Sequence, residues 1–469
     1  MFDRKESRVR VPYERWGRGW CAIFLGLFAI AVAFTGGASR FDAIQILPLR
    51  SLSAVFLICS VFYLTKKGSE TERVLTALLG FFALIVALQL APLPPWLWPD
   101  LPRSAEIVRL DAAIGIKDVW RPLSLTPMRT SNVLGSLVVP GAALLLVHAF
   151  RTSSTTLLQI VAGMGVVSAL LGILQIATGK TRIFYLYEVT NRGSPVGLLA
   201  NENHAAIFAA CSMLVITFLG LKAKRKSGAL LERMLYSSAF LLILFVSLVG
   251  GSRAGLLAAV GAILVSICML AMSSHHRHGQ SAGPGLVRRW LDRVPSLILV
   301  VPITVVSLTA ASFLTLDRAP AFQDILAQDG FEDLRWSIWP VIANILKEHW
   351  LMGTGFGSFE QIYHIHEPTT LLMPSYVNQA HNDWAQYLIE GGVLAGFLFI
   401  GLLIWFTKQI AAIAARRALR VDAIFWTSIF AVIGAASMID YPLRTPLFQL
   451  VTIWLLVALS RDARNAAAR

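Results

Sequence analysis

The stretch SYVNQAHNDWAQYLIEGGVLAGFLFIGLLIWF, residues 375–406, begins as a polar segment and becomes an apolar run long enough to cross a membrane. A helix needs about 20 predominantly apolar residues to span the hydrocarbon core of a bilayer. His381, Asp383 and Glu390 nevertheless fall within its first turns, where burying an ionisable group costs free energy. The stretch predicts a membrane helix whose polar start serves a function.

The rest of the chain has the same apolar character. Of its 469 residues, 56% are hydrophobic and only 14% are charged, whereas a soluble domain is about a quarter charged. We expect an all-α polytopic membrane protein that forms a single integral membrane domain over residues 1–469, with an uncleaved first helix. The apolar blocks predict twelve spans, near residues 20–36, 43–64, 73–92, 130–150, 155–178, 203–221, 235–252, 254–273, 295–315, 382–406, 422–439 and 443–460.

The basic residues indicate the orientation of these spans. If the N-terminus is cytoplasmic and the spans alternate, the inner segments hold most of the 41 Lys and Arg residues, as the positive-inside rule requires. The formal charge of +14 is therefore mainly a topology signal. Nucleic-acid binding is disfavoured, because the charge is spread over many short loops.

The longest connection, residues 316–381, is predicted to lie on the outer side before the tenth helix. Connections of more than about 12–15 residues are usually functional or disordered, and this one is too rich in Trp, Phe and Tyr for disorder. Apolar residues recur every three to four positions within residues 334–345, as on a helix. We expect an ordered, partly helical cap, in which the glycine-rich GTGFGSF (353–359) forms a turn rather than a nucleotide-binding loop.

Ionisable residues on the outer side are the candidates for chemistry. The sequence has neither a G-x-x-x-x-G-K-[ST] nor an H-E-x-x-H motif, which argues against ATP hydrolysis and that type of zinc site. Arg253 stands between two apolar runs, and an Arg at such a depth is usually functional or paired. Arg335 begins the helical part of the long loop, where the residues alone favour a surface charge paired with Glu332 or Asp333.

His381 is the candidate base. At the N-terminus of a helix, the dipole disfavours an imidazolium and leaves a neutral imidazole that can accept a proton. Helical geometry places Glu390 on another face, so we expect Glu390 to contact polar groups of another helix. Two guanidinium groups match the oxygens of a diphosphate. Together these residues predict glycosyl transfer from a lipid diphosphate, which supplies the driving energy.

The chain resembles the bacterial O-antigen ligase-like family, which includes O-antigen ligases and related O-antigen and exopolysaccharide polymerases, over about residues 20–460. The likeness implies about twelve helices in the inner membrane, with a periplasmic loop that covers the site. It also implies transfer of undecaprenyl-diphosphate-linked glycans to an acceptor sugar without metal or ATP. The motifs that carry the resemblance are LGILQIATG (171–179), GLLANENHAA (197–206), GGSRAG (250–255), RWSIWPVIANILKEHWLMGTGFGSF (335–359) and HNDWAQYLIEGGVLAG (381–396).

The resemblance also implies roles for single residues. His381 is expected to be catalytic, Arg253 and Arg335 to bind the diphosphate, and no cofactor or metal ligand is predicted. The expected partners are the undecaprenyl-diphosphate-linked glycan, a saccharide acceptor and membrane lipids. Possible cavity-lining residues are Asn201, Asn203, His204 and Asn382.

The acceptor stays open at the level of sequence. A ligase passes the glycan to lipid A-core, which is the reading we adopt, whereas a polymerase passes it to a second lipid-linked repeat unit. A lipid-linked saccharide transporter is an alternative of another class. Such a transporter would be expected to show inverted repeats and broken helices near the midplane, and the long outer loop favours an enzyme.

Overall fold

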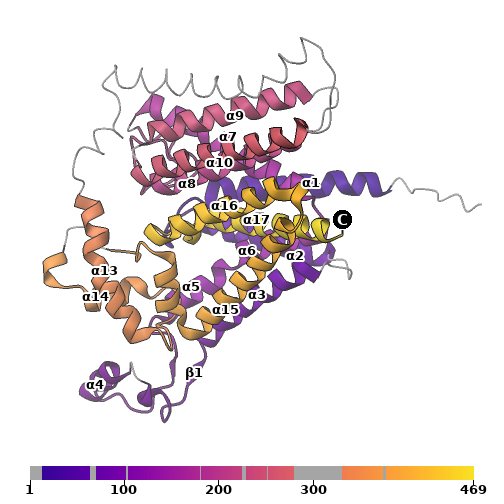
Figure 1. Ribbon diagram of the computed structural model, residues 1–469. Coiled ribbons are helices and arrows are strands. Elements are labelled where there is room, and N and C mark those ends of the chain that lie inside the picture. The colour runs from indigo at the N-terminus through magenta and orange to yellow at the C-terminus, as the bar shows by residue number, and fades with distance from the viewer. Residues whose placement is uncertain are drawn as a thin grey trace, which may run out of the picture.

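The computed structural model describes residues 13–63, 70–101, 104–179, 181–223, 229–250, 252–278, 330–372 and 377–468. Most of its helices lie side by side as a bundle (Figure 1). They are α1 (Tyr13–Thr35), α2 (Ile46–Tyr63), α3 (Glu70–Leu88), α5 (Pro127–Ser136), α6 (Val138–Phe150), α7 (Ser154–Thr178), α8 (Glu202–Lys222), α9 (Ala229–Val249), α10 (Arg253–His278), α15 (Asp383–Ala414), α16 (Arg420–Ile439) and α17 (Pro446–Ala467).

The all-helical character predicted from sequence is confirmed. Every predicted span except the one near residues 295–315 coincides with a described helix, and that span lies outside the described residues. In the described part of the chain, eight helices are long and apolar enough to cross a membrane, and α1 and α2 contain shorter apolar stretches. The total of twelve spans stays a prediction.

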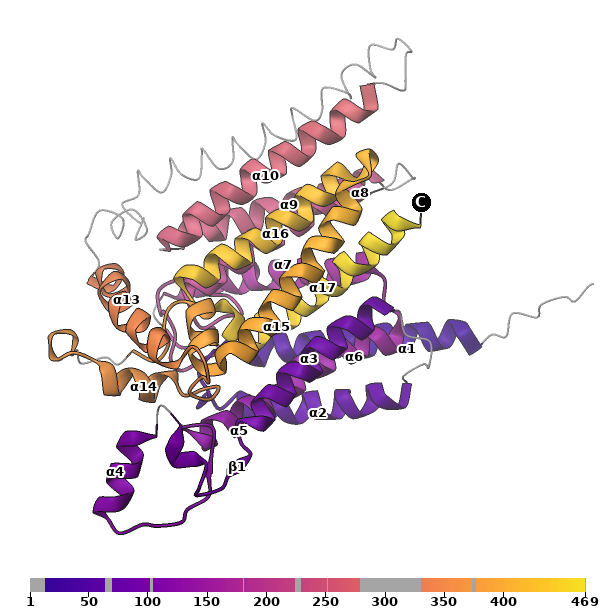
Figure 2. The same cartoon turned by 60° about the horizontal axis from the view of Figure 1, so that its bottom comes forward.

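Several further elements gather at one end of the bundle, which we call the capped end (Figures 1 and 2). The C-terminus lies at the opposite end (Figure 1). Strands β1 (Pro92–Leu93) and β2 (Arg121–Pro122) pair antiparallel and are a small exception to the helical fold. The other elements of the capped end are η1 (Trp98–Asp100), α4 (Ala105–Ala113), α13 (Gly330–His349), α14 (Phe359–His366), η2 (Thr369–Leu371) and η4 (Pro442–Arg444).

Helices α8 and α17 form the centre of the bundle, and most of their residues are buried. A helix that is apolar on all sides is stable in such a central position, because each of its faces packs against other apolar helices. The first turn of α8 and the turn before α17 both lie at the capped end, because His204 of α8 contacts Tyr441 just before η4. The core therefore brings two segments that are far apart in sequence to the same polar region.

Helix α15 is broken near its start, at Gly392, whose φ of 63° is left-handed. A break of this kind leaves carbonyl groups without their helical partners. The backbone N–H groups of Thr354 and Gly355 donate to the carbonyls of Ile389 and Glu390, at 2.9 and 3.0 Å. The loop that follows α13 is thereby attached to α15, and with it the cap to the bundle.

The predicted glycine-rich turn at residues 353–359 is confirmed. Gly353, Gly355 and Gly357 all have positive φ, a conformation that L side chains rarely adopt. Gln89, just after α3, accepts from the N–H of Phe356 and donates to the carbonyl of Glu390, both at 2.9 Å. The turn therefore joins α3, α15 and the cap.

We expect Gly353→Ala to destabilise the protein. A Cβ at this position would lie 2.5 Å from the carbonyl oxygen of Glu390, and the φ of +69° would be strained. Strain at one such position costs about 1–3 kcal/mol, and the backbone contact adds to it. The apparent melting temperature in detergent should fall. The control is Gly401→Ala in α15, whose Cβ would meet only Leu78 at 4.0 Å; equal melting temperatures of the two variants would contradict the argument.

Candidate active site

Four side chains gather around the carboxylate of Asp440 at the capped end, those of His204, Arg335, His381 and Tyr441, and we call these five residues the Asp440 cluster. Asp440 follows the last residue of α16. Its Oδ1 lies 3.6 Å from Nε2 of His204 and 3.6 Å from Nδ1 of His381. Its Oδ2 lies 3.9 Å from a terminal nitrogen of Arg335. The rings of His204 and His381 both meet Tyr441 edge-on, at centroid distances of 5.2 and 5.0 Å.

The cluster is buried but loosely bonded. Asp440 is 4% exposed and His204 is 1% exposed, yet the separations of 3.6–3.9 Å are longer than hydrogen bonds. Within the described residues, both nitrogens of His204, Nδ1 of His381, Nε of Arg335 and Oδ2 of Asp440 are buried without a hydrogen-bond partner. Buried polar atoms normally have such partners. The cluster therefore has capacity to bond a polar ligand.

The charges of the cluster are set by its packing. Burial opposes ionisation of Asp440, but the imidazoles of His204 and His381 outweigh it and hold the pKa of that carboxyl well below its usual range. Burial, and then the Asp440 carboxylate, raise the pKa of Tyr441 above its usual range. Asp440 is therefore an anion and Tyr441 a neutral hydroxyl at neutral pH.

The structure corrects the predicted position of His381. The residue lies before α15, with a left-handed φ of 48°, because Asn382 caps the helix by accepting from the N–H of Ala385 at 2.9 Å. His381 is therefore outside the first turn of the helix, where the dipole was expected to act on it. Oδ1 of Asp440 instead faces Nδ1 of the imidazole at 3.6 Å, and Nε2 is the nitrogen on the side of the ring away from this carboxylate. His381 is also the more accessible imidazole, since its side chain is 16% exposed and that of His204 is 2% exposed.

The remaining predicted site residues occupy helix starts. Arg253 begins α10, and the preceding Ser252 donates to Oδ1 of Asn203 at 2.6 Å. Asn203 is adjacent to His204, so Arg253 lies at the capped end, beside the first turn of α8. Asn201 caps α8 by accepting from the N–H groups of Asn203 and His204. Asn201 and Asn382 thus have a structural role as caps, which the sequence analysis did not assign to them.

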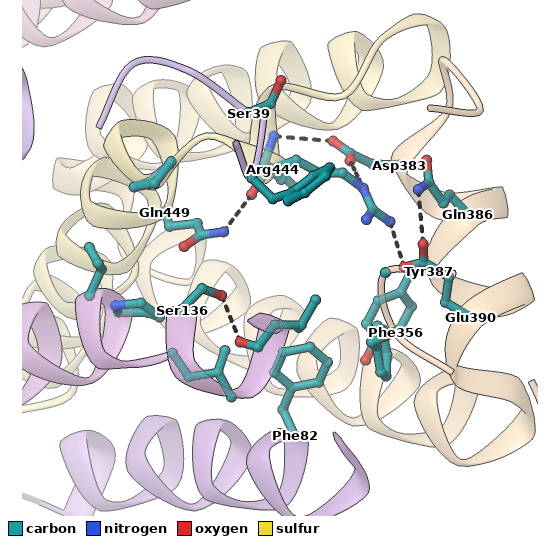
Figure 3. A pocket seen from close by; sticks show the side chains of 18 of the residues that line it. Ser39, Phe82, Ser136, Phe356, Asp383, Gln386, Tyr387, Glu390, Arg444 and Gln449 are labelled. Carbon is teal, nitrogen blue, oxygen red and sulfur yellow. Dashed lines mark hydrogen bonds and ion pairs between the residues drawn. The ribbon is translucent and has the colours of Figure 1, made fainter. Parts of the chain in front are cut away.

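A cavity of about 480 Å³ adjoins the start of α15, on the side of this helix away from the Asp440 cluster. Most of its wall is apolar and comes from α2, α3, α6, α15 and α17, and its polar part includes Asp383, Gln386, Glu390 and Arg444. Figure 3 shows Arg444 directed toward Asp383 and Glu390. None of the residues assigned to the site from sequence is among the described residues that line this cavity.

Glu390 is anchored in this wall, as predicted. It is fully buried, and its Oε2 lies 3.1 Å from a terminal nitrogen of Arg444. Its Oε1 accepts from Nε2 of Gln386 at 3.0 Å. Arg444 also lies 3.6 Å from Asp383, whose Oδ2 accepts from the N–H of Leu443 at 3.1 Å. This network joins α15 to η4 and holds Asp440 and His381 on neighbouring segments.

Asp440, Tyr441 and Arg444 were missed from sequence. The segment DYPLR (440–444) reads as a short outer connection between two spans. The signal was nevertheless present, because Asp440 and Arg444 are ionisable residues between two apolar runs with almost no loop. The same argument had selected Arg253.

The family model described as O-antigen ligase matches residues 238–400. The match confirms the likeness to the O-antigen ligase-like family. It includes Arg253, Arg335 and His381, whereas His204 and Asp440 lie outside it. A comparison with curated proteins found no match.

Proposed function

We propose that the chain is a glycosyltransferase of the bacterial inner membrane that moves a glycan from undecaprenyl diphosphate to an acceptor sugar hydroxyl on the periplasmic side. We assign it to the O-antigen ligase type, with lipid A-core as the acceptor. The observation that carries the proposal is the convergence of Arg335, His381 and His204 on Asp440, at the end of the bundle that also holds Arg253. The match to the O-antigen ligase model supports the reaction type.

In the proposed reaction, Arg253 and Arg335 hold the diphosphate of the donor, and their guanidinium groups match its oxygens. Nε2 of His381 accepts the proton of the acceptor hydroxyl. The bond from the acceptor oxygen to the anomeric carbon forms while the bond from that carbon to the diphosphate breaks. Undecaprenyl diphosphate leaves, and its added negative charge is stabilised by the two arginines. Asp440 orients the imidazole, as the carboxylate of a catalytic triad does.

The apolar cavity supports a substrate with a lipid chain. Its volume of about 480 Å³ is in the range of ligand sites, and we propose that it takes part of the undecaprenyl chain. Arg50 in its wall donates to Asn132 at 2.8 and 3.1 Å and, among the described residues, pairs with no carboxylate. This charge could attract a lipid phosphate, so Arg50→Gln tests whether the diphosphate lies in the cavity. On our assignment, the donor affinity of Arg50→Gln stays within a few-fold of wild type.

The function is tested by reconstitution with a defined undecaprenyl-diphosphate-linked glycan. Lipid A-core is offered as acceptor in one reaction and a second lipid-linked repeat unit in another. Glycan transfer to lipid A-core supports the ligase assignment, and elongation of the lipid-linked glycan would assign a polymerase instead. Vesicles loaded with the lipid-linked glycan, without acceptor, test transport: movement across the bilayer without transfer would reject an enzyme.

The donor arginines give a prediction of their own. Arg253→Lys and Arg335→Lys keep the charge but lose the planar guanidinium, so we expect turnover to fall at least tenfold in each variant. Binding of undecaprenyl diphosphate, measured by displacement of a labelled analogue, should weaken as well. The control is Arg192→Lys, because Arg192 is exposed and its guanidinium donates to the backbone carbonyl of Glu188 at 3.3 Å. Full activity of both lysine variants would contradict bidentate recognition.

A further inference from the structure

The C-terminal ends of α13 and α14 meet in the cap, away from the Asp440 cluster. His349 is the last residue of α13, His366 is the last residue of α14, and Glu348 precedes His349. The two helices are packed together by a shared apolar cluster that includes Ile345 and Ile362. This packing fixes the distance between their C-terminal ends.

The three polar side chains lie close enough together to surround a metal ion. Oε1 of Glu348 lies 3.7 Å from Nε2 of His349, and Oε2 lies 3.8 Å from Nε2 of His366. Hydrogen bonds between such atoms would be about 2.7–3.2 Å long. In a tetrahedral zinc site with bonds of about 2.0–2.2 Å, neighbouring ligand atoms lie about 3.3–3.6 Å apart. The two separations are therefore too long for hydrogen bonds, and one ligand atom from each of the three residues lies within 4.8 Å of the other two, so that small side-chain rotations bring them to the edge lengths of a coordination tetrahedron.

The electrostatic potential where the C-terminal ends of α13 and α14 meet also favours a cation. Both helices direct the negative ends of their dipoles toward this corner, and Glu348 adds a carboxylate. Access is possible, because the side chains of Glu348 and His366 are 55% and 28% exposed, while His349 is buried between the helices. The corner therefore combines a fixed inner ligand with two that an ion can reach from solvent.

We propose that Glu348, His349 and His366 form a binding site for Zn²⁺, with water at the fourth position. Two imidazoles and a carboxylate are a typical zinc ligand set. The site is structural, since Arg335 at the other end of α13 lies about 21 Å away at 1.5 Å per residue. The ion would join α13, which carries Arg335, to α14. The proposal rests on the geometry of the cap and is independent of the glycosyl transfer.

Metal binding is measured on the untagged full-length protein, purified in detergent and treated with a chelator. We expect one Zn²⁺ per chain and a higher melting temperature when Zn²⁺ is added. Co²⁺ in place of Zn²⁺ should give the visible absorption of a four-coordinate site. His366→Ala and Glu348→Gln should each weaken Zn²⁺ binding at least tenfold and remove the thermal shift. His364→Ala is the control, because His364 faces Glu367 at 3.5 Å and lies outside the proposed ligand set.

Each outcome decides the proposal. Stoichiometric binding that is lost in both ligand variants and kept in His364→Ala supports it. Binding of equal affinity in wild type and in Glu348→Gln, or no binding by the folded wild type, overturns it. Glu348 is exposed, so this variant is expected to fold even if His366→Ala does not. Transfer activity is not used as the readout, so failure of the proposed function leaves this test intact.

Discussion

Replacing His381 by alanine should lower the turnover number by about 10²–10⁴-fold, the usual contribution of a general base, while the donor still binds. The imidazole is the accessible one of the two that face Asp440, and its Nε2 is the nitrogen left for the acceptor hydroxyl. Arg335 does not depend on His381 for its position, since it belongs to α13 and contacts the other carboxylate oxygen of Asp440. Single-turnover kinetics and donor affinity of the purified variant measure the two effects separately.

Glu390→Gln is the matched comparison on the same segment. Glu390 is fully buried and paired with Arg444, whose side chain is 21% exposed, so its neutralisation removes the nearest carboxylate of a half-buried guanidinium and leaves Asp383 at 3.6 Å. Loss of one partner of a fully buried pair costs about 3–5 kcal/mol, and the exposure of Arg444 and its contact with Asp383 make the cost here smaller. We expect a lower melting temperature and poorer expression, with little change in single-turnover rate for the protein that folds. If His381→Ala turned over at the wild-type rate while Glu390→Gln were folded and inert, the two roles would have to be exchanged.

The local features of this chain were readable from sequence because membrane helices are specified by local composition. A run of about 20 apolar residues must form a helix, since lipid offers no partners for backbone polar groups. The turn at residues 353–359 was likewise readable from its glycines, whereas the partial burial of Arg335 was not, because its residues alone favoured a surface charge. The polar partner of Glu390 was expected, although its identity as Arg444 was not.

What the sequence did not reveal are relations between distant segments. Asp440 can be recognised as a candidate site residue only in the folded structure, where α8, α13 and the segment before α15 place His204, Arg335 and His381 around it. The break at Gly392 was also missed, because a pair of glycines inside an apolar run fits an unbroken membrane helix. The break becomes necessary only once the cap loop donates its N–H groups to the carbonyls of residues 389 and 390.

Asp440→Asn should also lower turnover by about 10²–10⁴-fold, although Asp440 touches no substrate in the proposed reaction. An amide keeps the size of the side chain and can still accept from the N–H of Tyr441, which now donates to Oδ1 at 3.0 Å. It removes the negative charge that orients His381 and stabilises the imidazolium formed when the acceptor loses its proton. In a catalytic triad, the same exchange leaves the geometry intact and lowers the rate by about 10⁴.

A purely structural role for Asp440 predicts a different pattern. Loss of folding would reduce donor binding and turnover together, whereas a positioning role lowers turnover alone. The charge of Arg335 is no longer offset in Asp440→Asn, so donor affinity should be unchanged or higher. Weaker donor binding in the folded variant, or turnover within a few-fold of wild type, would contradict the assignment.

The pH range of this comparison follows from the charge of Asp440. Because the folded protein lowers the pKa of this carboxyl, its ionised form contributes stability that is fully present above the unfolded value of about 3.9 and is lost as pH falls through the folded pKa. Asp440 therefore keeps its charge between about pH 5 and 9. A pH profile of turnover over this range should show no titration of Asp440 in wild type. The lower turnover of Asp440→Asn is then due to the missing negative charge and should be the same throughout this pH range. If the turnover of Asp440→Asn equalled that of wild type at one end of the range, the effect would have to come from the titration of another group.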